Sequence, residues 1–178
     1  MTVKYLFAGF GGQGILFAGK LLAYKGLTEG KNVSWLPSYG PEMRGGTASC
    51  SVIVSDEEIG APIVLEPDVL IAMNLPSLDK YEKDVVPGGK IFADSSLIER
   101  GVSRSDVEAC RIPATQMAAD NALDGLANMI IMGKVLEDAG EYDEAAVEKA
   151  LGKCISARHA DLLDKNRAAL LLGRDFKA

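Results

Sequence analysis

The chain has 178 residues, of which 48% are hydrophobic, and its formal net charge of −6 gives a pI near 4.9. Domains commonly have about 100–150 residues, so this length predicts one domain with enough apolar side chains for a core. The acidic balance disfavours a nucleic-acid-binding protein, which usually presents a basic face.

Cysteine content and hydropathy disfavour disulfide-bonded, metal-binding and membrane-spanning proteins. Cys50, Cys110 and Cys154 are far apart in the sequence. Their odd number and spacing favour neither a disulfide framework nor a zinc site, and an iron–sulfur cluster usually needs four thiolates. No apolar run approaches the roughly 20 residues that span a bilayer, and the N-terminus lacks a signal-peptide pattern. We therefore expect a cytoplasmic protein with reduced thiols and no membrane segment.

The first elements predict a strand–helix–strand unit. Residues 3–8 form a short apolar run typical of a buried strand, and apolar residues at helical spacing predict a helix over 14–29 that ends at Gly30. Residues 32–36 predict a second strand, closed by Pro37. Because parallel strands need a crossover connection, we expect a βαβ unit whose two strands are neighbours.

The rest of the chain divides into a strand-rich and a helical part. Strands are expected at 47–54, 69–73, 90–94 and 107–112, with a polar turn at 55–62 and a helix from Pro76 toward Val85. Helices are expected at 114–123, 125–139, 143–155 and 157–172, with Gly140 and Gly173 as stops. The prediction is a single α/β domain over 1–178. It has a mostly parallel Rossmann-like sheet flanked by helices in about 1–113 and a helical part in about 114–178.

A glycine-rich loop follows the first predicted strand. Gly9, Gly11 and Gly14 satisfy the pattern G-x-G-x-x-G between a strand and a helix. Glycines permit close backbone approach, and helix N-terminal amides attract phosphate or carboxylate groups. A dinucleotide site also needs an acidic residue about 20 positions later, but residues 34–38 contain none. An anion or carbonyl contact, close approach of a partner chain, or tight packing without a ligand therefore remain as interpretations.

A second glycine-rich loop follows the second predicted strand. It consists of Tyr39, Gly40, Pro41, Glu42, Met43, Arg44, Gly45 and Gly46. Arg44 could reach an anionic group with its planar guanidinium, whereas Glu42 could pair with Arg44 or both could be solvated. Parallel strands would place both loops at the carboxyl edge of the sheet, where ligands of such folds bind.

Other polar and apolar residues have simpler interpretations. His159 is expected on the surface, and Asp94 is expected to form a turn or a helix cap. Trp35 is expected in the core or in a subunit contact, and the apolar run 129–132 in the core, with a partner surface as the alternative. The sequence shows no nucleophile–base motif and no metal-ligand motif, so we expect no catalytic residue and no metal site in this chain alone.

On these motifs the chain resembles the gamma subunit of the 2-oxoacid:ferredoxin (or acceptor) oxidoreductases. The resemblance rests on GFGGQG at 9–14, SYGPEMRGG at 38–46, TASCSVIVS followed by DEEIGAP, PDVLIAMN, and ANMIIMGKVL at 127–136. It covers most of the chain. The YGPE-x-RGG form is most similar to the 2-oxoglutarate branch, with branched-chain (ketoisovalerate) and pyruvate enzymes as alternatives.

The resemblance implies a subunit of a multisubunit enzyme of the EC 1.2.7 class. Such an enzyme converts 2-oxoglutarate and coenzyme A to succinyl-CoA and carbon dioxide and passes electrons to ferredoxin. It uses thiamine diphosphate, magnesium and 4Fe–4S clusters. This chain has no GDG-type signature and no cysteine cluster. The resemblance therefore places these cofactors on partner subunits of thiamine-binding, alpha and ferredoxin-like type, and implies that the isolated chain is inactive.

The two loops are the candidate site. The hypothesis is that they complete the active centre and face coenzyme A, through Gly9, Gly11, Gly12, Gln13, Gly14, Tyr39, Gly40, Pro41, Glu42, Arg44, Gly45 and Gly46. Gly11, Gly12 and Gln13 would offer amides, and Arg44 a positive charge, to a phosphate of coenzyme A, to thiamine diphosphate or to a substrate carboxylate. A stand-alone dinucleotide-binding reductase and a small anion-binding or scaffolding module are the alternatives.

Overall fold

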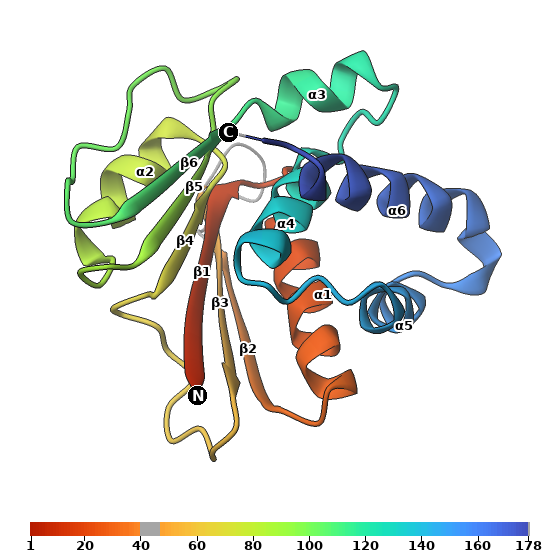
Figure 1. Ribbon diagram of the computed structural model, residues 1–178, viewed down its shortest axis with the longest axis horizontal. Coiled ribbons are helices and arrows are strands. Elements are labelled where there is room, and N and C mark those ends of the chain that lie inside the picture. The colour runs from red at the N-terminus through yellow and green to blue at the C-terminus, as the bar shows by residue number, and fades with distance from the viewer. Residues whose placement is uncertain (40–46, 178) are drawn as a thin grey trace.

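The computed structural model describes residues 1–39 and 47–177. Its helices pack on the two faces of one mixed sheet. Within these ranges six strands follow the spatial order β2-β3-β1-β4-β5-β6 (Figure 1). The strands are β1 Thr2–Phe10, β2 Asn32–Tyr39, β3 Thr47–Ser55, β4 Val69–Ala72, β5 Lys90–Asp94 and β6 Glu108–Ile112. The helices are α1 Ile15–Thr28, α2 Leu75–Tyr81, η1 Glu82–Asp84, α3 Ala114–Asp120, α4 Ala127–Asp138, α5 Glu144–Cys154, η2 Ala157–His159 and α6 Ala160–Arg174.

The strand directions confirm a mostly parallel sheet but correct its order. β1, β4, β5 and β6 are parallel neighbours, whereas β3 runs antiparallel to both β1 and β2. The expectation that β1 and β2 are neighbours is therefore wrong, because β3 lies between them. An antiparallel partner needs only a short connection, so β2 pairs with the strand that follows it in sequence.

Pro37 does not close β2, contrary to prediction. The strand continues to Tyr39, and Pro37 pairs in register with Cys50 of β3. β2 is the outermost strand of the sheet, so one side of its backbone has no neighbouring strand. Proline, which lacks an N–H group, is tolerated at such an edge.

Alternating strand residues divide the core between the two faces of the sheet. Tyr5 and Phe7 pack with α1, α4, α5 and α6, whereas Leu6 packs with the side chains of α2 and of the loop after β5. Figure 1 shows the four longer helices on one side of the strands and α2 on the other. The apolar run 129–132 is buried, which confirms its core assignment.

The helical part contains a close crossing of α4 and α6. Gly173 lies inside α6 and does not end it, so its predicted role as a stop is wrong. A Cβ atom at Gly173 would lie 1.7 Å from the carbonyl oxygen of Ile130, and one at Gly133 would lie 1.9 Å from that of Leu170. The two glycines therefore allow the helix backbones to touch. Gly140, with φ of +66°, does follow the end of α4 as predicted.

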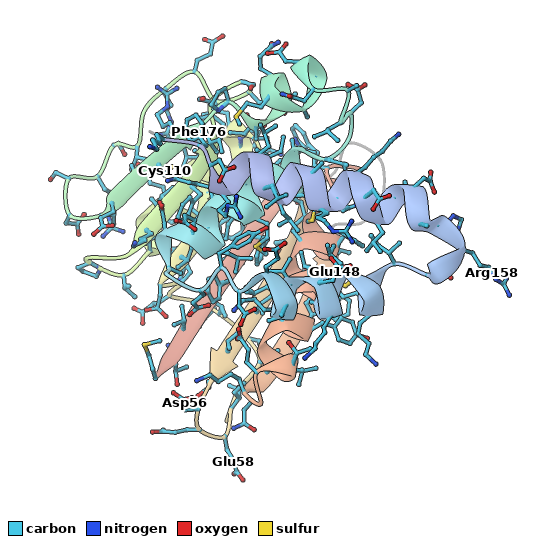
Figure 2. All side chains as sticks on the ribbon, turned by 45° about the vertical axis from the view of Figure 1, so that its right-hand side comes forward. Asp56, Glu58, Cys110, Glu148, Arg158 and Phe176 are labelled. Atoms are coloured by element: carbon cyan, nitrogen blue, oxygen red, sulfur yellow. The ribbon has the colours of Figure 1, made fainter. Side chains whose placement is uncertain are left out.

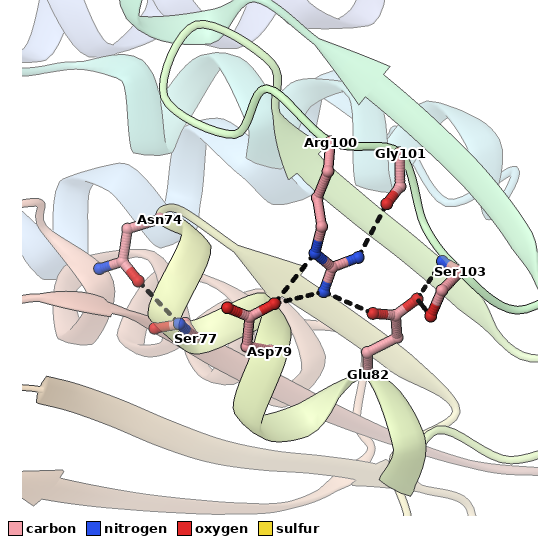
Figure 3. A network of polar contacts seen from close by, with 7 residues as sticks. All are labelled: Asn74, Ser77, Asp79, Glu82, Arg100, Gly101 and Ser103. Carbon is pink, nitrogen blue, oxygen red and sulfur yellow. Dashed lines mark hydrogen bonds and ion pairs between the residues drawn. The ribbon is translucent and has the colours of Figure 1, made fainter.

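A polar cluster fixes the long connection between β5 and β6 onto α2 and η1 (Figure 3). Arg100 donates to Asp79 and, at 2.7 Å, to Glu82. The hydroxyl and the backbone N–H of Ser103 also donate to Glu82. Glu82 is buried, and charge-assisted hydrogen bonds of this kind offset the cost of burying a carboxylate.

Helix α2 begins one residue earlier than predicted. The side chain of Asn74 accepts a hydrogen bond from the N–H of Ser77 at 2.9 Å and caps the helix. Leu75 is thus the first helical residue and Pro76 the second, where a missing N–H is still no loss. Among the described residues, no helix is long and apolar enough to cross a membrane.

Candidate functional site

The first glycine loop joins β1 to α1 at the carboxyl edge of the sheet, as predicted. Gly14 precedes the first residue of α1 and has φ of +71°, in the left-handed region. A Cβ atom at Gly14 would lie 2.3 Å from Nδ2 of Asn128, and one at Gly9 would lie 2.6 Å from Oε1 of Gln13. Gly14 therefore requires glycine for both conformation and space, whereas Gly9 requires it for space alone.

The side chain of Gln13 closes this loop. Its Oε1 accepts from the N–H of Phe10 at 2.7 Å and from Nδ2 of Asn74 at 3.3 Å. Its Nε2 donates to the carbonyl oxygen of Met73 at 3.0 Å. The side-chain amide thus binds the loop to the junction of β4 and α2. If Gln13 also donated to a ligand, it would have to use an amide group that already forms hydrogen bonds within the chain.

Asn128 holds the loop from the opposite side. Its Nδ2 donates to the carbonyl oxygen of Gly14 at 3.0 Å, across 114 residues of sequence. Its Oδ1 is buried and has no hydrogen-bond partner in the part of the chain that the structure describes. The loop is therefore anchored by side chains from α4 and from the β4–α2 junction as well as by its own backbone.

Two shallow hollows flank the loop. One, of about 260 Å³, lies between Gly12 and Gln13 and residues of α3, with the exposed Leu97 beside it. The other, also about 260 Å³, lies against Phe10, Gly11 and Ala48. Both are smaller than the roughly 300–1,000 Å³ of most small-molecule pockets. The loop thus presents its backbone on an open surface.

The second glycine loop lies outside the described residues for the most part. Gly40, Pro41, Glu42, Arg44, Gly45 and Gly46 fall in the segment that the structure does not describe. Its two ends are described: Tyr39 pairs with Ala48, and Thr47 pairs with Phe10 at the end of β1. The flanks of the second loop therefore lie beside the first loop, with β3 between β2 and β1.

Asp94 has the cap role that the sequence predicts. Its carboxylate is fully buried and accepts from the N–H of Ser96 at 3.0 Å. It also accepts from the N–H and hydroxyl of Thr115 in the first turn of α3. Negative charge at a helix N-terminus is favourable, so Asp94 holds α3 beside the glycine loop.

The remaining candidates are structural. Burial raises the pKa of the Cys50 thiol to about 12 and that of Cys154 to about 11, so both thiols stay protonated at neutral pH. His159 is exposed beside Arg158, which projects from the molecule in Figure 2. Trp35 is 39% exposed on the edge strand, so of its two expected places, the core and a subunit contact, the core is wrong and the subunit contact stays a prediction. In residues 1–39 and 47–177, no three His, Cys, Asp or Glu side chains gather as metal ligands.

Sequence reasoning missed the two asparagines that hold the first loop. Asn74 carries a recognisable signal, because an Asn directly before a Leu-Pro pair is typical of a helix N-terminus. Asn128 carries none, since its partner Gly14 is remote in sequence. Only the packing of α4 against the start of α1 brings the two together.

Known proteins are similar to this chain in sequence and in structure. The model of the family described as "Pyruvate ferredoxin/flavodoxin oxidoreductase" matches residues 4–176. Ketoisovalerate oxidoreductase subunit VorA of Methanothermobacter thermautotrophicus is 39% identical over 175 residues, which are 98% of this chain. The chain spans only 36% of the length of that relative.

Two further proteins match over nearly their whole length. The 2-oxoglutarate synthase subunit KorC of Methanothermobacter marburgensis is 34% identical over 99% of this chain and 97% of its own. The crystal structure of the gamma subunit of keto/oxoacid ferredoxin oxidoreductase from Geobacter sulfurreducens PCA superimposes with a TM-score of 0.81. That match has 28% identity and covers 96% of this chain and 95% of that one.

Proposed function

Since the chain belongs to the pyruvate ferredoxin/flavodoxin oxidoreductase family, we propose that it is the gamma-type subunit of a 2-oxoacid:ferredoxin oxidoreductase. The complex would convert 2-oxoglutarate and coenzyme A to succinyl-CoA and carbon dioxide, with electrons passed to ferredoxin. The single observation that carries this proposal is the match to a KorC subunit, which is 34% identical over 99% of this chain. The same motifs that predicted the family, GFGGQG and YGPEMRGG, lie on the two loops of the candidate site.

A second candidate substrate rests on a specific observation. The VorA relative has the higher identity, 39% against 34%, although this chain spans only part of it. A branched-chain 2-oxoacid such as ketoisovalerate is therefore the alternative substrate, while the proposed reaction type stays the same. The matches to KorC subunits of several organisms, together with the YGPE-x-RGG form of the second loop, support 2-oxoglutarate.

The cofactors of such a complex would be bound by partner subunits. The thiols of this chain do not fit an iron–sulfur cluster, because Cys50, Cys110 and Cys154 lie on β3, β6 and α5 and are buried or partly buried. Thiamine diphosphate and magnesium are assigned by the same proposal to a thiamine-binding partner. This chain would contact thiamine diphosphate, magnesium and coenzyme A only at its interface with that partner.

The proposed task of this chain is to complete the active centre. The β1–α1 loop is held rigid by Gln13, Asn74 and Asn128, so its backbone amides need no ordering when a partner or an anionic group approaches. The flanks of the second loop lie beside it. Arg44 would add a positive charge for a phosphate or a carboxylate.

The sheet order argues against a stand-alone dinucleotide-binding reductase. A dinucleotide site takes its ribose-binding acid from the end of the strand beside β1. Here that neighbour is β3, which runs antiparallel and begins at this edge with Thr47. On this side of β1 the edge therefore carries the start of a strand rather than its end, and the described residue there, Thr47, is not an acid.

Purification of the native complex tests the proposal. The tagged chain would be isolated without oxygen from its own cells, and its partners identified by mass spectrometry. We expect thiamine-binding and ferredoxin-like subunits, and ferredoxin reduction that depends on coenzyme A. In a panel of 2-oxoglutarate, ketoisovalerate and pyruvate, 2-oxoglutarate should be used fastest. Faster ketoisovalerate turnover would select the second substrate, and a chain that purifies without a thiamine-binding partner would refute the assignment.

A further inference from the structure

A second hollow lies at the amino edge of the sheet, opposite the glycine loops. It has a volume of about 370 Å³ and is formed by the beginnings of β1, β4 and β5 and by the connection after α4. Figure 1 marks this end of β1 with the N-terminus. Its apolar walls include Val3, Val69, Phe92 and Val135. The volume falls within the about 300–1,000 Å³ of small-molecule sites, which are mostly apolar with a few polar groups.

An uncharged polar group in the wall of this hollow is the hydroxyl of Tyr5. The side chain is 2% exposed and lines the hollow. Within residues 1–39 and 47–177 the structure contains no hydrogen bond to this hydroxyl. The hydroxyl belongs to the lining of the hollow, so it is free to form a hydrogen bond with a ligand that enters.

The charges around Tyr5 are mainly negative. Asp68 and Glu141 line the hollow, and Glu29, paired with Lys25 at 2.7 Å, is a third carboxylate whose charge acts on Tyr5. Burial first, and then these three carboxylates, raise the pKa of Tyr5. A negative potential at a buried hydroxyl favours a positively charged ligand.

The one lysine in the lining is already engaged. Nζ of Lys90 donates to the carbonyl oxygen of Asp138 at 3.1 Å and pairs with Glu108 at 3.4 Å. Glu141, by contrast, lies 3.7 Å from Lys25, which is nearer to Glu29. Glu141 is therefore the carboxylate of this hollow with the most remaining capacity for a cation.

We propose that this hollow binds a small molecule that has an apolar body and one primary ammonium group. The apolar body packs on Val69, Phe92 and Val135, and the ammonium group donates to the Tyr5 hydroxyl oxygen and to the Glu141 carboxylate. The site is independent of the proposed function, because it lies at the opposite edge of the sheet and needs no partner subunit.

A ligand series on the full chain tests the charge preference. Benzylamine, benzyl alcohol and benzoate share one ring and differ in charge. Titration followed by ¹H–¹⁵N NMR should show benzylamine binding at least tenfold more tightly than the other two, with shifts centred on Tyr5, Val69 and Glu141. Equal or tighter binding of benzoate or benzyl alcohol, shifts centred on Gly12 and Gln13, or no binding of benzylamine would overturn the proposal.

Two conservative variants test the named contacts. Tyr5→Phe and Glu141→Gln should each weaken benzylamine binding about tenfold, the value of one good hydrogen bond or charge contact. Tyr24→Phe and Glu144→Gln are matched controls on α1 and α5 and should leave the affinity unchanged. Wild-type affinity in both test variants would also refute the site. If Tyr5→Phe unfolds, the ligand series on the unaltered chain still decides.

Discussion

Gln13 illustrates how a residue in a binding motif can act inside the chain. The glycine pattern predicted a loop that offers amides to a ligand, whereas the Gln13 side chain bonds Phe10, Met73 and Asn74. Its contribution to the proposed site is therefore rigidity. Arg44, outside the described residues, remains the predicted source of charge.

Replacing Gln13 should loosen the loop without touching the core. Gln13→Ala leaves the Phe10 N–H and the Met73 carbonyl without their partner. We expect the free energy of unfolding to fall by about 1–3 kcal/mol in urea denaturation. Gln116→Ala, on the exposed surface of α3, is the control and should change it by less than about 0.5 kcal/mol. Equal effects of the two variants would contradict the anchoring role.

The charge of Arg44 is tested in the assembled complex. A charge-assisted hydrogen bond contributes on the order of 1.5–3 kcal/mol. Arg44→Ala should therefore lower turnover, or raise the coenzyme A requirement, by about tenfold or more in steady-state kinetics. Arg158→Ala, at the exposed position of Figure 2, should leave the rates unchanged. Unaltered kinetics for Arg44→Ala would remove this arginine from the site.

At the scale of elements, two contacts determine how the helices pack. The glycines of α4 and α6 let two helix backbones meet, and the cluster around Glu82 attaches the long β5–β6 connection to α2 (Figure 3). Both contacts stabilise the frame that carries α3 and α4 beside the first loop. Each can be tested on the isolated chain.

The helix crossing predicts opposite effects for the same substitution at two helical glycines. Gly173→Ala forces a Cβ atom against a backbone carbonyl, and overpacking of this kind costs about 1–3 kcal/mol. At Gly152 in α5 no atom lies within 4 Å of the added Cβ, so alanine should stabilise the helix by about 0.5–1 kcal/mol. Thermal unfolding measures both. A neutral Gly173→Ala would show that the crossing is loose.

Glu82 predicts a loss of stability in acid. Burial opposes its ionisation, but hydrogen bonds from Arg100 and Ser103 outweigh burial and lower its pKa below the ordinary 4.5. A lowered carboxyl pKa stabilises the fold fully above the ordinary value, and this stabilisation is lost as the pH falls through the lower, folded-state value.

The Glu82→Gln variant measures this contribution. The difference in unfolding free energy between wild type and Glu82→Gln should be largest near pH 7 and shrink below about pH 4.5. Urea denaturation at several pH values measures the difference. Glu99→Gln, at an exposed position of the same connection, is the matched control for replacing a carboxylate with an amide. A pH-independent difference for Glu82→Gln would contradict the assigned pKa direction.

At the scale of the whole molecule, the chain presents a rigid loop at one edge of the sheet, held by Asn128. The proposed function assigns the cofactors to other subunits. The purified chain should reduce no viologen dye with 2-oxoglutarate and coenzyme A, and it should not retain NAD(P). Adding the partner subunits should restore dye reduction. Activity of the chain alone, or tight NAD(P) binding, would contradict a subunit role.

The sequence by itself determined the element types, the family and the position of the first loop. Local signals suffice for these: apolar runs of strand length, helical spacing, and glycines where a strand meets a helix. The turn at Asp94 and the 129–132 run as core were also predictable, because both depend on neighbours in sequence, whereas the bonds from Thr115 to Asp94 span 21 residues.

Only the tertiary structure decided the neighbours in space. β3 rather than β2 pairs with β1, and Pro37 lies within an edge strand. Gly173 lies where α6 crosses α4, and its missing side chain lets the two backbones touch. Asn128 reaches Gly14 across 114 residues. Each depends on contacts between segments remote in sequence, whose free energy comes from packing and leaves no periodic signal in the chain.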